Sequence, residues 1–179
     1  TESGLKVGVF AGAFNINGAL ARSEIQKLRQ QGAEVVIAAI HWGVEGAYRP
    51  NGGQTSFAHD LIDYGADIVY GSHPHVLQPV EEYKEGIIFY SMANFCFGGN
   101  HWPPDLDTAI LQQTFVRGED GKLHRDELIC IPCSISSIKT TMQNNFQPTP
   151  YEEGSDAYNR VLSKLDNTWK GANLGAKYD

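Results

Sequence analysis

The 179-residue sequence has no apolar run near the roughly 20 residues that a membrane-spanning helix needs. Its first residues, Thr1 to Gly4, are too polar for a signal peptide. Because the chain does not begin with Met, we expect it to be a piece of a longer protein. The lack of a membrane-spanning run and of a signal peptide in this sequence is therefore compatible with an anchor in the upstream part of that protein.

Basic residues are also scarce. The chain has 14 Lys and Arg against 21 Asp and Glu, a formal net charge of −7. Non-specific binding to nucleic acid requires a basic face, so we expect no nucleic-acid partner and no general role at a membrane surface. An anionic substrate would require a metal ion or local cations that reverse the field at the site.

Cysteine is rare, with only Cys96, Cys130 and Cys133. An odd number of three excludes a disulfide framework. Cys130 and Cys133 have the CxxC spacing, but they lie in a strand-like segment that Pro132 interrupts. This context favours a half-buried apolar pair over a redox or zinc site.

What the sequence does contain is an alternation of strand-like and helix-like segments. The predicted strands are Leu5–Gly12, Val35–Ile40, Ala66–Gly71 and Ile87–Ser91. The predicted helices are Ser23–Gln31 and Thr55–Tyr64, each followed by a glycine, with loops expected at Asn15–Ala19 and Tyr48–Gly53. This order predicts a layered α/β fold with parallel strands.

The pattern changes after Thr108. Ala109–Arg117 and Glu127–Ile131 flank a polar turn at residues 118–121, which predicts an antiparallel hairpin. A surface loop at Gln143–Gly154, an amphipathic helix at Tyr158–Leu165 and a loose tail at Ala172–Asp179 are expected to follow.

Three histidines follow two of the predicted strands. His41 comes directly after Val35–Ile40, while His73 and His75 come directly after Ala66–Gly71. A right-handed crossover makes these strands parallel, so the histidines should emerge at the same carboxyl edge of the sheet. Open α/β sheets place their ligand sites at this edge.

The His73-Pro74-His75 spacing suggests a metal site. Pro74 favours an extended backbone, in which the two histidines would point to the same side, about 6.6 Å apart. Neutral imidazole is a good ligand for zinc, iron, nickel or manganese. A solvated or hydrogen-bonded loop pair is the alternative, and sharing the edge with His41 favours the metal.

Other polar side chains lie near these histidines in the sequence. Glu45 could be a ligand, orient a histidine or act as a base, or it could be an exposed loop carboxylate. Asn94 could bind a phosphate or carboxylate oxygen, or form an Asx turn. Arg49 could clamp an anionic group, or be a surface arginine. We interpret the remaining histidines as structural or solvated: His59, His101 and His124.

Three blocks of residues together resemble a known family. They are His41-Trp42-Gly43-Val44-Glu45 with Pro50 and Gln54, the stretch Leu61 to Pro79 that contains Gly71-Ser72-His73-Pro74-His75, and Ile88 to Phe95. In this order and spacing they resemble the C-terminal half of the CapA-type poly-γ-glutamate capsule biosynthesis family. Ala93 stands where that family usually has Gly, and the looser resemblance runs from about Gly4 to Leu165.

The resemblance implies the C-terminal half of a layered α/β/β/α metallophosphoesterase-like sandwich. Residues 1–154 would belong to that domain, and residues 155–179 would form a C-terminal helix and tail. His41, His73 and His75 match positions that line the metal site. Glu45 and Asn94 would serve catalysis, and Arg49 with Asn94 would contact the substrate.

The upstream half of such proteins supplies further metal-site elements, namely a Gly-Asp pair, an acidic residue and an Asn-His pair. This sequence contains no Gly-Asp dipeptide, and its single Asn-His pair, Asn100-His101, follows the third block. We therefore expect a divalent metal (Mn, Fe or Zn), with a second ion held by ligands from the missing N-terminal half or from a second chain.

The leading hypothesis is a metal-dependent hydrolase-like protein for the synthesis, export or trimming of an anionic capsule polymer such as poly-γ-glutamate. The family implies the cell envelope or extracellular face of a bacterium, in a complex that upstream sequence could anchor in the membrane. One alternative is a non-catalytic protein that holds the polymer in the same cleft. Another is a phosphodiesterase for a nucleotide or lipid phosphate. Whether the chain is an enzyme stays open at this point.

Overall fold

The computed structural model describes residues 4–174. Strands and helices alternate in the first half and give way to a long hairpin and a last helix. In chain order they are β1 (Val7–Ala13), α1 (Gly18–Gln30), β2 (Val35–His41), α2 (Gly52–Asp63), β3 (Ile68–Ser72), β4 (Val80–Tyr83), β5 (Gly86–Phe89), β6 (Asp107–Arg117), β7 (Leu123–Ser134), β8 (Thr149–Pro150) and α3 (Asp156–Leu165).

The strands form two sheets. The larger has the order β1-β2-β3-β5-β4, in which β4 alone is antiparallel, to β5. The smaller has the order β6-β7-β8 and is antiparallel. The predicted parallel strands and hairpin are confirmed. Strand β4 was not predicted, because four residues with two glutamates, Val80–Tyr83, lack the apolar pattern of a buried strand.

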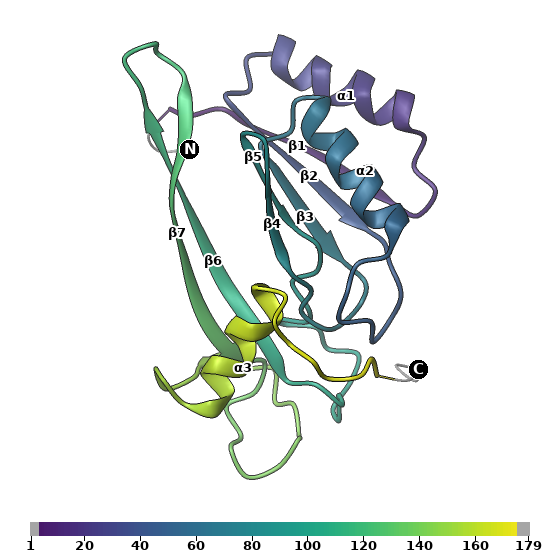
Figure 1. The fold of residues 1–179 in the computed structure, drawn as a ribbon, viewed down its shortest axis with the longest axis vertical. Coiled ribbons are helices and arrows are strands. Elements are labelled where there is room, and N and C mark those ends of the chain that lie inside the picture. Colours follow the sequence, from purple (N-terminus) through teal and green to yellow (C-terminus); the bar gives the residue numbers. More distant parts are fainter. Residues whose placement is uncertain (1–3, 175–179) are drawn as a thin grey trace.

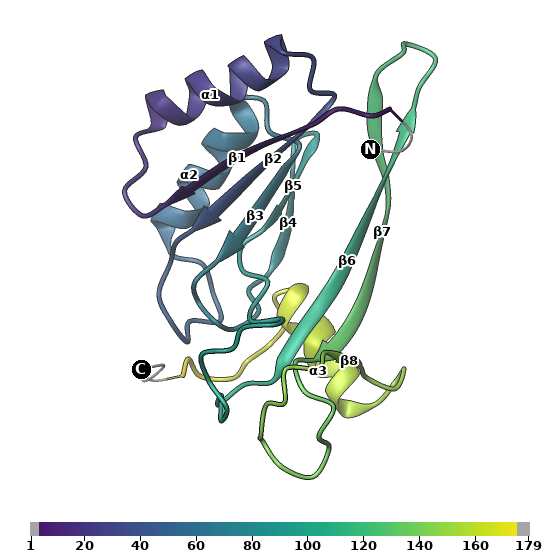
Figure 2. The ribbon, with the colours of Figure 1, turned by 180° about the vertical axis from the view of Figure 1, so that it is seen from behind.

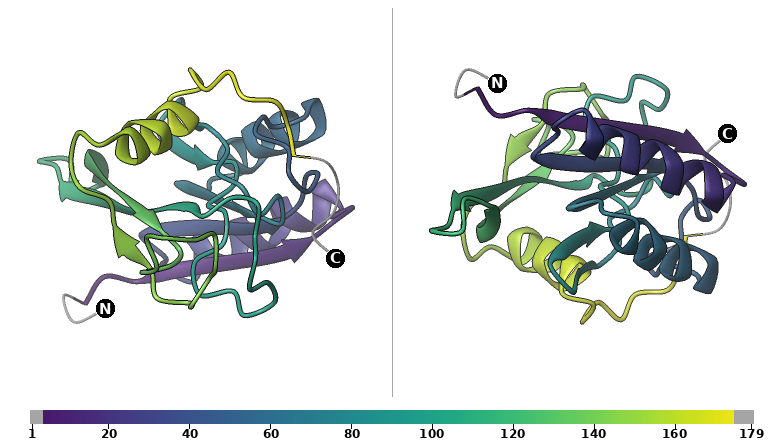
Figure 3. Two further views of the ribbon diagram at one scale, coloured as in Figure 1. Left: turned by 90° about the horizontal axis from the view of Figure 1, so that it is seen from below. Right: turned by 90° about the horizontal axis from the view of Figure 1, so that it is seen from above.

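The sheets and helices are layered (Figure 1). Helices α1 and α2 cover one face of the larger sheet, and the hairpin β6–β7 lies on the opposite side (Figures 1 and 2). Helix α3 packs beside the hairpin, as the views along the long axis show (Figure 3). The mixed α/β class is therefore confirmed, and the arrangement is consistent with the expected metallophosphoesterase-like fold.

Two apolar cores separate these layers. The first lies between the helices and the larger sheet, and includes Ile25, Leu61 and Val69. The second joins the other face of β5 to the hairpin and α3, and includes Phe89 and Val161. Burial of such side chains supplies most of the free energy that holds layers together.

Both long helices begin earlier than predicted. The Asn17 side chain accepts hydrogen bonds from the backbone N–H groups of Ala19 and Leu20, so α1 begins at Gly18 and the predicted loop is shorter. Asn51 and Gln54 form a capping box that starts α2 at Gly52. Asparagine is a strong N-cap, and each cap lies several positions before Ile25 or Phe57, the first apolar residue of the helical pattern that predicted its helix.

Part of the predicted loose tail is ordered. The backbone N–H of Leu174 donates to the carbonyl of Gly46 at 2.9 Å, and the Asn173 side chain accepts from the N–H of Tyr48 at 3.0 Å. The prediction was therefore wrong for these two residues. The rest of the predicted tail, residues 175–179, lies outside the described residues.

One face of the larger sheet is only partly covered. Val9 on β1 is 57% exposed and Tyr70 on β3 is 42% exposed, although both point toward the hairpin side. Together with Phe89 and Ile110 they line an apolar groove of about 610 Å³ between the two sheets. The hairpin covers the β5 side of this face and leaves the β1 side open.

Candidate metal centre

The register of the parallel strands brings three strand ends level. Ala13 at the end of β1 pairs with His41 of β2, and His41 pairs with Ser72 of β3. The loops that leave these strands therefore start from one edge, as the sequence predicted. His41 is the last residue of its strand, and His73 directly follows the end of β3.

Glu45, His73 and His75 converge at this edge. One ligand atom from each lies within 4.8 Å of the others, which is close enough to hold a single ion. The Nε2 atom of His75 is 3.9 Å from the Oε1 atom of Glu45. All three side chains are partly buried, so an ion there would be shielded from bulk solvent on the protein side.

The backbone at the two histidines differs from the prediction. His73 has φ 100° and His75 has φ 59°, so the segment turns through two left-handed residues and is not extended. The extended prediction was therefore wrong. The N–H of Gly46 donates to the carbonyl of Pro74, between the histidines, and this bond fixes the turn to the Glu45 loop. Such backbone strain persists only where surrounding contacts enforce it, and it is common at functional sites.

Asn94 orients one ligand. Its Oδ1 atom lies 2.7 Å from the Nδ1 atom of His75, and its side chain is buried. With Oδ1 as the acceptor, Nδ1 carries the hydrogen and Nε2 becomes the metal-binding nitrogen. The preceding Ala93 has φ 59°, a conformation that favours glycine. This explains why glycine is the residue expected there.

His41 lies beside the three clustered residues but is not one of them. Its ring centroid is 4.7 Å from that of His73, and its Nδ1 atom is 3.2 Å from the hydroxyl of Ser72. The structure therefore brings two of the three predicted metal histidines together with Glu45, and places the third against them. The role of His41 as a ligand stays a prediction.

The surroundings of His73 favour the neutral form of its imidazole by lowering its pKa. Burial lowers the pKa of His73, and the adjacent rings of His41 and His75 lower it further, while Glu45 acts in the opposite direction. A metal ion binds only the neutral form of imidazole, so this shift reduces proton competition for the ligand.

Two phenylalanines that the sequence did not single out flank the histidines. The Phe14 ring meets His41 at 5.2 Å and His73 at 4.8 Å, both edge to face, and Phe97 lies 5.2 Å from His75. Both phenylalanines are about half exposed. Phe14 directly follows the end of β1 and Phe97 lies in the loop between β5 and β6, but nothing in the sequence distinguishes either from an ordinary loop aromatic.

Arg49 and the other histidines have partners elsewhere. The Arg49 guanidinium donates to the carbonyl of Trp169 at 2.6 Å. His59 stacks on Tyr83 and meets Glu81, His101 contacts Phe146, and His124 contacts Asp120. These contacts agree with a structural or solvated role for the three histidines. Substrate binding by Arg49 stays a prediction.

Trp42 and Gly71 join the histidine-bearing strand ends. The Trp42 indole crosses β3 and donates from Nε1 to the carbonyl of Tyr90 at 2.9 Å. A Cβ atom at residue 71 would lie 2.0 Å from that carbonyl oxygen and 2.6 Å from Nε1. Residue 71 must therefore be glycine for the indole and β5 to approach β3 this closely.

The donor set fits a divalent transition metal. Two imidazoles and one carboxylate are ligands of zinc, iron and manganese sites, and three protein ligands leave a position for substrate or water. The cluster lies at the carboxyl edge of the parallel strands of the larger sheet. Fold and site together define an α/β protein of metallophosphoesterase-like architecture with a candidate metal centre.

Comparison with known proteins gives the family. The sequence profile of the family described as "Bacterial capsule synthesis protein PGA_cap" matches residues 10–99, half of the chain. The chain therefore belongs to this family. The matched range contains Glu45, His73, His75 and Asn94, and ends before the hairpin.

Named relatives agree with this membership. The chain is 38% identical over 104 residues to the capsule biosynthesis protein CapA of Bacillus anthracis, a match that covers 56% of this chain and 25% of the relative. It is 40% identical over 90 residues to the PGA biosynthesis protein CapA of Bacillus subtilis, covering 50% and 23%. A probable polyglutamine synthesis accessory protein of Mycobacterium tuberculosis is 39% identical over 57 residues, covering 32% and 15%. The matched region spans about a quarter of the length of the two Bacillus proteins.

Proposed function

We propose that this chain is the metal-binding part of a hydrolase-like protein that acts in the biosynthesis of an anionic capsule polymer such as poly-γ-glutamate. The observation that carries the proposal is the convergence of Glu45, His73 and His75 to within 4.8 Å at one sheet edge. The names of the Bacillus relatives supply the polymer class and an association with the bacterial cell envelope. No helix of residues 4–174 is long and apolar enough to cross a membrane.

The residues of the site have different proposed roles. Glu45, His73 and His75 would hold the ion, and Asn94 would keep the Nε2 atom of His75 turned toward it. A bound divalent ion would supply Lewis-acid polarisation of a scissile phosphoryl or acyl oxygen and lower the pKa of a water molecule. If a further carboxylate replaced it as a ligand, Glu45 would instead act as a general base. His41, whose ring centroid lies 4.7 Å from that of His73, would help to hold a second ion, and the remaining ligands of that ion would come from outside this chain.

The His73→Ala variant of the full-length protein tests this proposal. Three properties are measured together: metal content, hydrolysis of model phosphodiesters and γ-glutamyl amides, and polymer production in cells. The proposal expects all three to fall together, because a catalytic metal site loses its activity with its ligand. Loss of metal with unchanged polymer production would show that catalysis at this site is not the protein's task. His101→Ala, which alters a histidine that contacts Phe146, is the matched control.

A non-catalytic polymer-binding protein is the second candidate, and the exposed Arg49 favours it. In that case affinity would depend on local cations, and Arg49→Ala would weaken polymer binding gradually while His73→Ala would leave it intact. The net charge of −7 argues for the metal, because the chain has few cations with which to hold a polyanion.

We also propose that the open apolar groove between the sheets is covered by the N-terminal half of the longer protein or by a second chain. Val9, Tyr70 and Phe95 are each more than 40% exposed beside this groove, an unusual concentration of large apolar side chains on a soluble surface. The matched relatives extend well beyond the region that this chain covers.

Val9→Asp in the full-length protein tests whether the groove is covered. If the groove is covered, a charge is buried without a partner, and the substitution should destabilise the protein by about 3 kcal/mol or more. Leu20→Asp, at a residue that is 55% exposed on the outer helix layer, is the control and should change stability by about 0.5 kcal/mol or less. Equal effects of the two substitutions in urea unfolding would show that the groove is open to solvent.

A further inference from the structure

We propose that residues 169–174, termed the C-terminal strap, position the Glu45 carboxylate for the metal ion. The proposal rests on the proposed metal site and adds a positioning element to it. The strap follows α3 and lies outside residues 10–99, the range that the family profile matches.

The strap is bonded to the loop that carries Glu45. The N–H of Leu174 donates to the carbonyl of Gly46 at 2.9 Å, and Asn173 accepts from the N–H of Tyr48 at 3.0 Å. The Arg49 guanidinium donates to the carbonyl of Trp169 at 2.6 Å. Three residues of the loop that directly follows Glu45 are therefore held by three residues of the strap.

Gly46 connects the strap to the histidines. Its carbonyl accepts from Leu174, while its N–H donates to the carbonyl of Pro74, between His73 and His75, at 2.9 Å. Glu45 is its immediate neighbour in the chain. One residue thus joins the strap on one side to the histidine turn on the other, and any movement of the strap displaces the attachment point of Glu45.

Glycine is required at this junction for two reasons. Gly46 has φ 70°, which L-residues rarely adopt, and a Cβ atom there would lie 2.7 Å from the carbonyl oxygen of Leu174. A side chain at residue 46 would push the strap away. The sequence places a glycine directly after Glu45, and the strap explains its spatial requirement.

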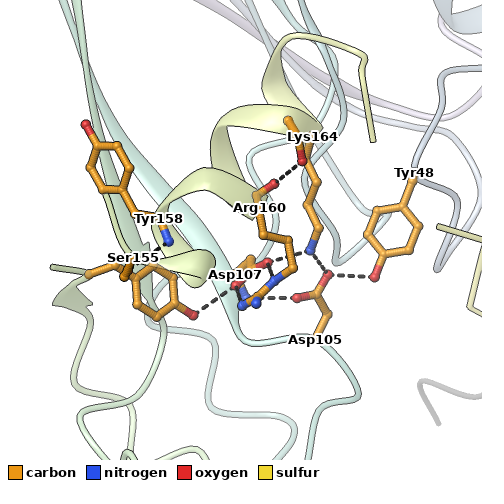
Figure 4. Close-up of polar contacts among 9 residues, drawn as sticks. Tyr48, Asp105, Asp107, Ser155, Tyr158, Arg160 and Lys164 are labelled. Atoms are coloured by element: carbon orange, nitrogen blue, oxygen red, sulfur yellow. Dashed lines mark hydrogen bonds and ion pairs between the residues drawn. The ribbon is translucent and has the colours of Figure 1, made fainter. Parts of the chain in front are cut away.

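A buried ionic network, shown in Figure 4, contacts the strap through Lys164. Lys164 of α3 is 3% exposed and lies 2.6 Å from both Asp105 and Asp107, while the Tyr48 hydroxyl donates to Asp105 at 2.7 Å. The Lys164 ammonium also lies over the rings of Tyr48 and Trp169, at 4.9 and 5.5 Å. The same lysine therefore fixes the end of the Glu45 loop and the start of the strap.

This arrangement makes a specific prediction about energetic coupling. If the strap acts through Glu45, weakening it should lower metal affinity only while the Glu45 carboxylate is present. A strap that merely stabilises the fold would lower metal affinity equally in the presence and absence of that carboxylate, because independent effects add.

The test uses Leu174→Pro, which removes the N–H donor to Gly46, and the milder Asn173→Ala in the full-length protein. Lys170→Ala is the control, because Lys170 is exposed and makes no hydrogen bond or ion pair with any residue from 4 to 174. Zn²⁺ and Mn²⁺ affinities are measured by calorimetry for each variant, alone and combined with Glu45→Gln. Amide hydrogen exchange of Gly46 is measured on the metal-free proteins.

We expect Leu174→Pro to speed exchange at Gly46 and to weaken metal binding by about tenfold, the lower end for loss of a ligand-orienting contact. Asn173→Ala should act in the same direction more weakly, and neither strap substitution should weaken metal binding further in the Glu45→Gln protein.

Unchanged amide exchange at Gly46, or equal losses of metal affinity with and without the Glu45 carboxylate, would overturn the inference. If the unsubstituted protein binds metal and the strap variants bind equally well, the strap inference alone is wrong. If the unsubstituted protein binds none, the proposed metal function is wrong as well.

Discussion

The Nδ1 atom of His75 lies 2.7 Å from the Oδ1 atom of Asn94, a buried side chain that follows β5. This contact joins the turn after β3 to the segment after β5 and fixes which nitrogen of His75 faces Glu45. The ligand geometry therefore depends on a residue that need not touch the ion.

Asn94→Ala tests this dependence. Without the acceptor the His75 ring can rotate and change tautomer, so metal affinity should fall by about 10- to 100-fold. Asn94→Asp keeps an acceptor at the same place and should retain most of the affinity. Calorimetric titration with Zn²⁺ measures both, and an affinity for Asn94→Ala equal to that of the unsubstituted protein would contradict the assigned role.

Gly71→Ala tests the close approach of the strands. The added Cβ would lie 2.0 Å from a backbone carbonyl that cannot rotate away, so β3 and β5 must separate. We expect a loss of about 3 kcal/mol in the free energy of unfolding, at the upper end for overpacking. Gly52→Ala, at a helix start where a Cβ meets nothing within 4 Å, is the matched control. Comparable urea midpoints for the two variants would disprove the steric requirement.

Lys164→Met tests the buried ionic network. Removal of the ammonium leaves the carboxylates of Asp105 and Asp107 buried with less compensation, although Arg160 still binds Asp107. The expected destabilisation is about 3–5 kcal/mol. Lys27→Met removes an exposed lysine that pairs with Glu24 at 3.5 Å, and should cost below about 1 kcal/mol. A difference of less than 1 kcal/mol between the two variants in chemical unfolding would refute the importance of the network.

The network also predicts how stability depends on pH. Burial works to raise the pKa of Asp107, but hydrogen bonds from Arg160 and the charge of Lys164 outweigh it and hold that pKa below the ordinary value of 3.8. Because the folded-state pKa is depressed, the unfolded state binds protons first as the pH falls. This stabilisation is therefore complete above pH 3.8 and is lost as the pH falls through the lower, folded-state pKa.

Unfolding free energies measured from pH 5 to pH 2 check whether stability falls with the pH in this way. They should fall in the unsubstituted protein and fall less steeply in Asp107→Asn. Asp126→Asn, which removes an exposed carboxylate of β7, controls for the loss of one acidic group. An equally steep fall in Asp107→Asn would show that another group is responsible.

Much of the fold followed from local sequence patterns. The nearly unbroken apolar run Val35–Ile40 is typical of a buried parallel strand, and β2 occupies Val35–His41. The alternation with two helices was enough to bring His41 and the His73 turn to one edge. The short strand β4 was missed because its pairing with β5 is decided by tertiary contacts and not by its own composition.

The site was less accessible to sequence reasoning. Its histidines and Glu45 were identified, but the left-handed backbone at His73 and His75 depends on the bond between Gly46 and Pro74, which joins distant segments. The end of the C-terminal strap, residues 172–174, was expected to be part of a loose tail because Asn173 and Leu174 belong to no periodic element. Their order comes from residues more than 120 positions earlier in the chain.

Anomalous X-ray diffraction from crystals of the full-length protein soaked in Zn²⁺ or Mn²⁺ tests the central claim most directly. The account predicts a peak bonded to Glu45, His73 and His75, with ligand distances of about 2.0–2.2 Å for zinc, and no such peak in the His73→Ala protein. A peak elsewhere, or an ion held by His41 without Glu45, would contradict it.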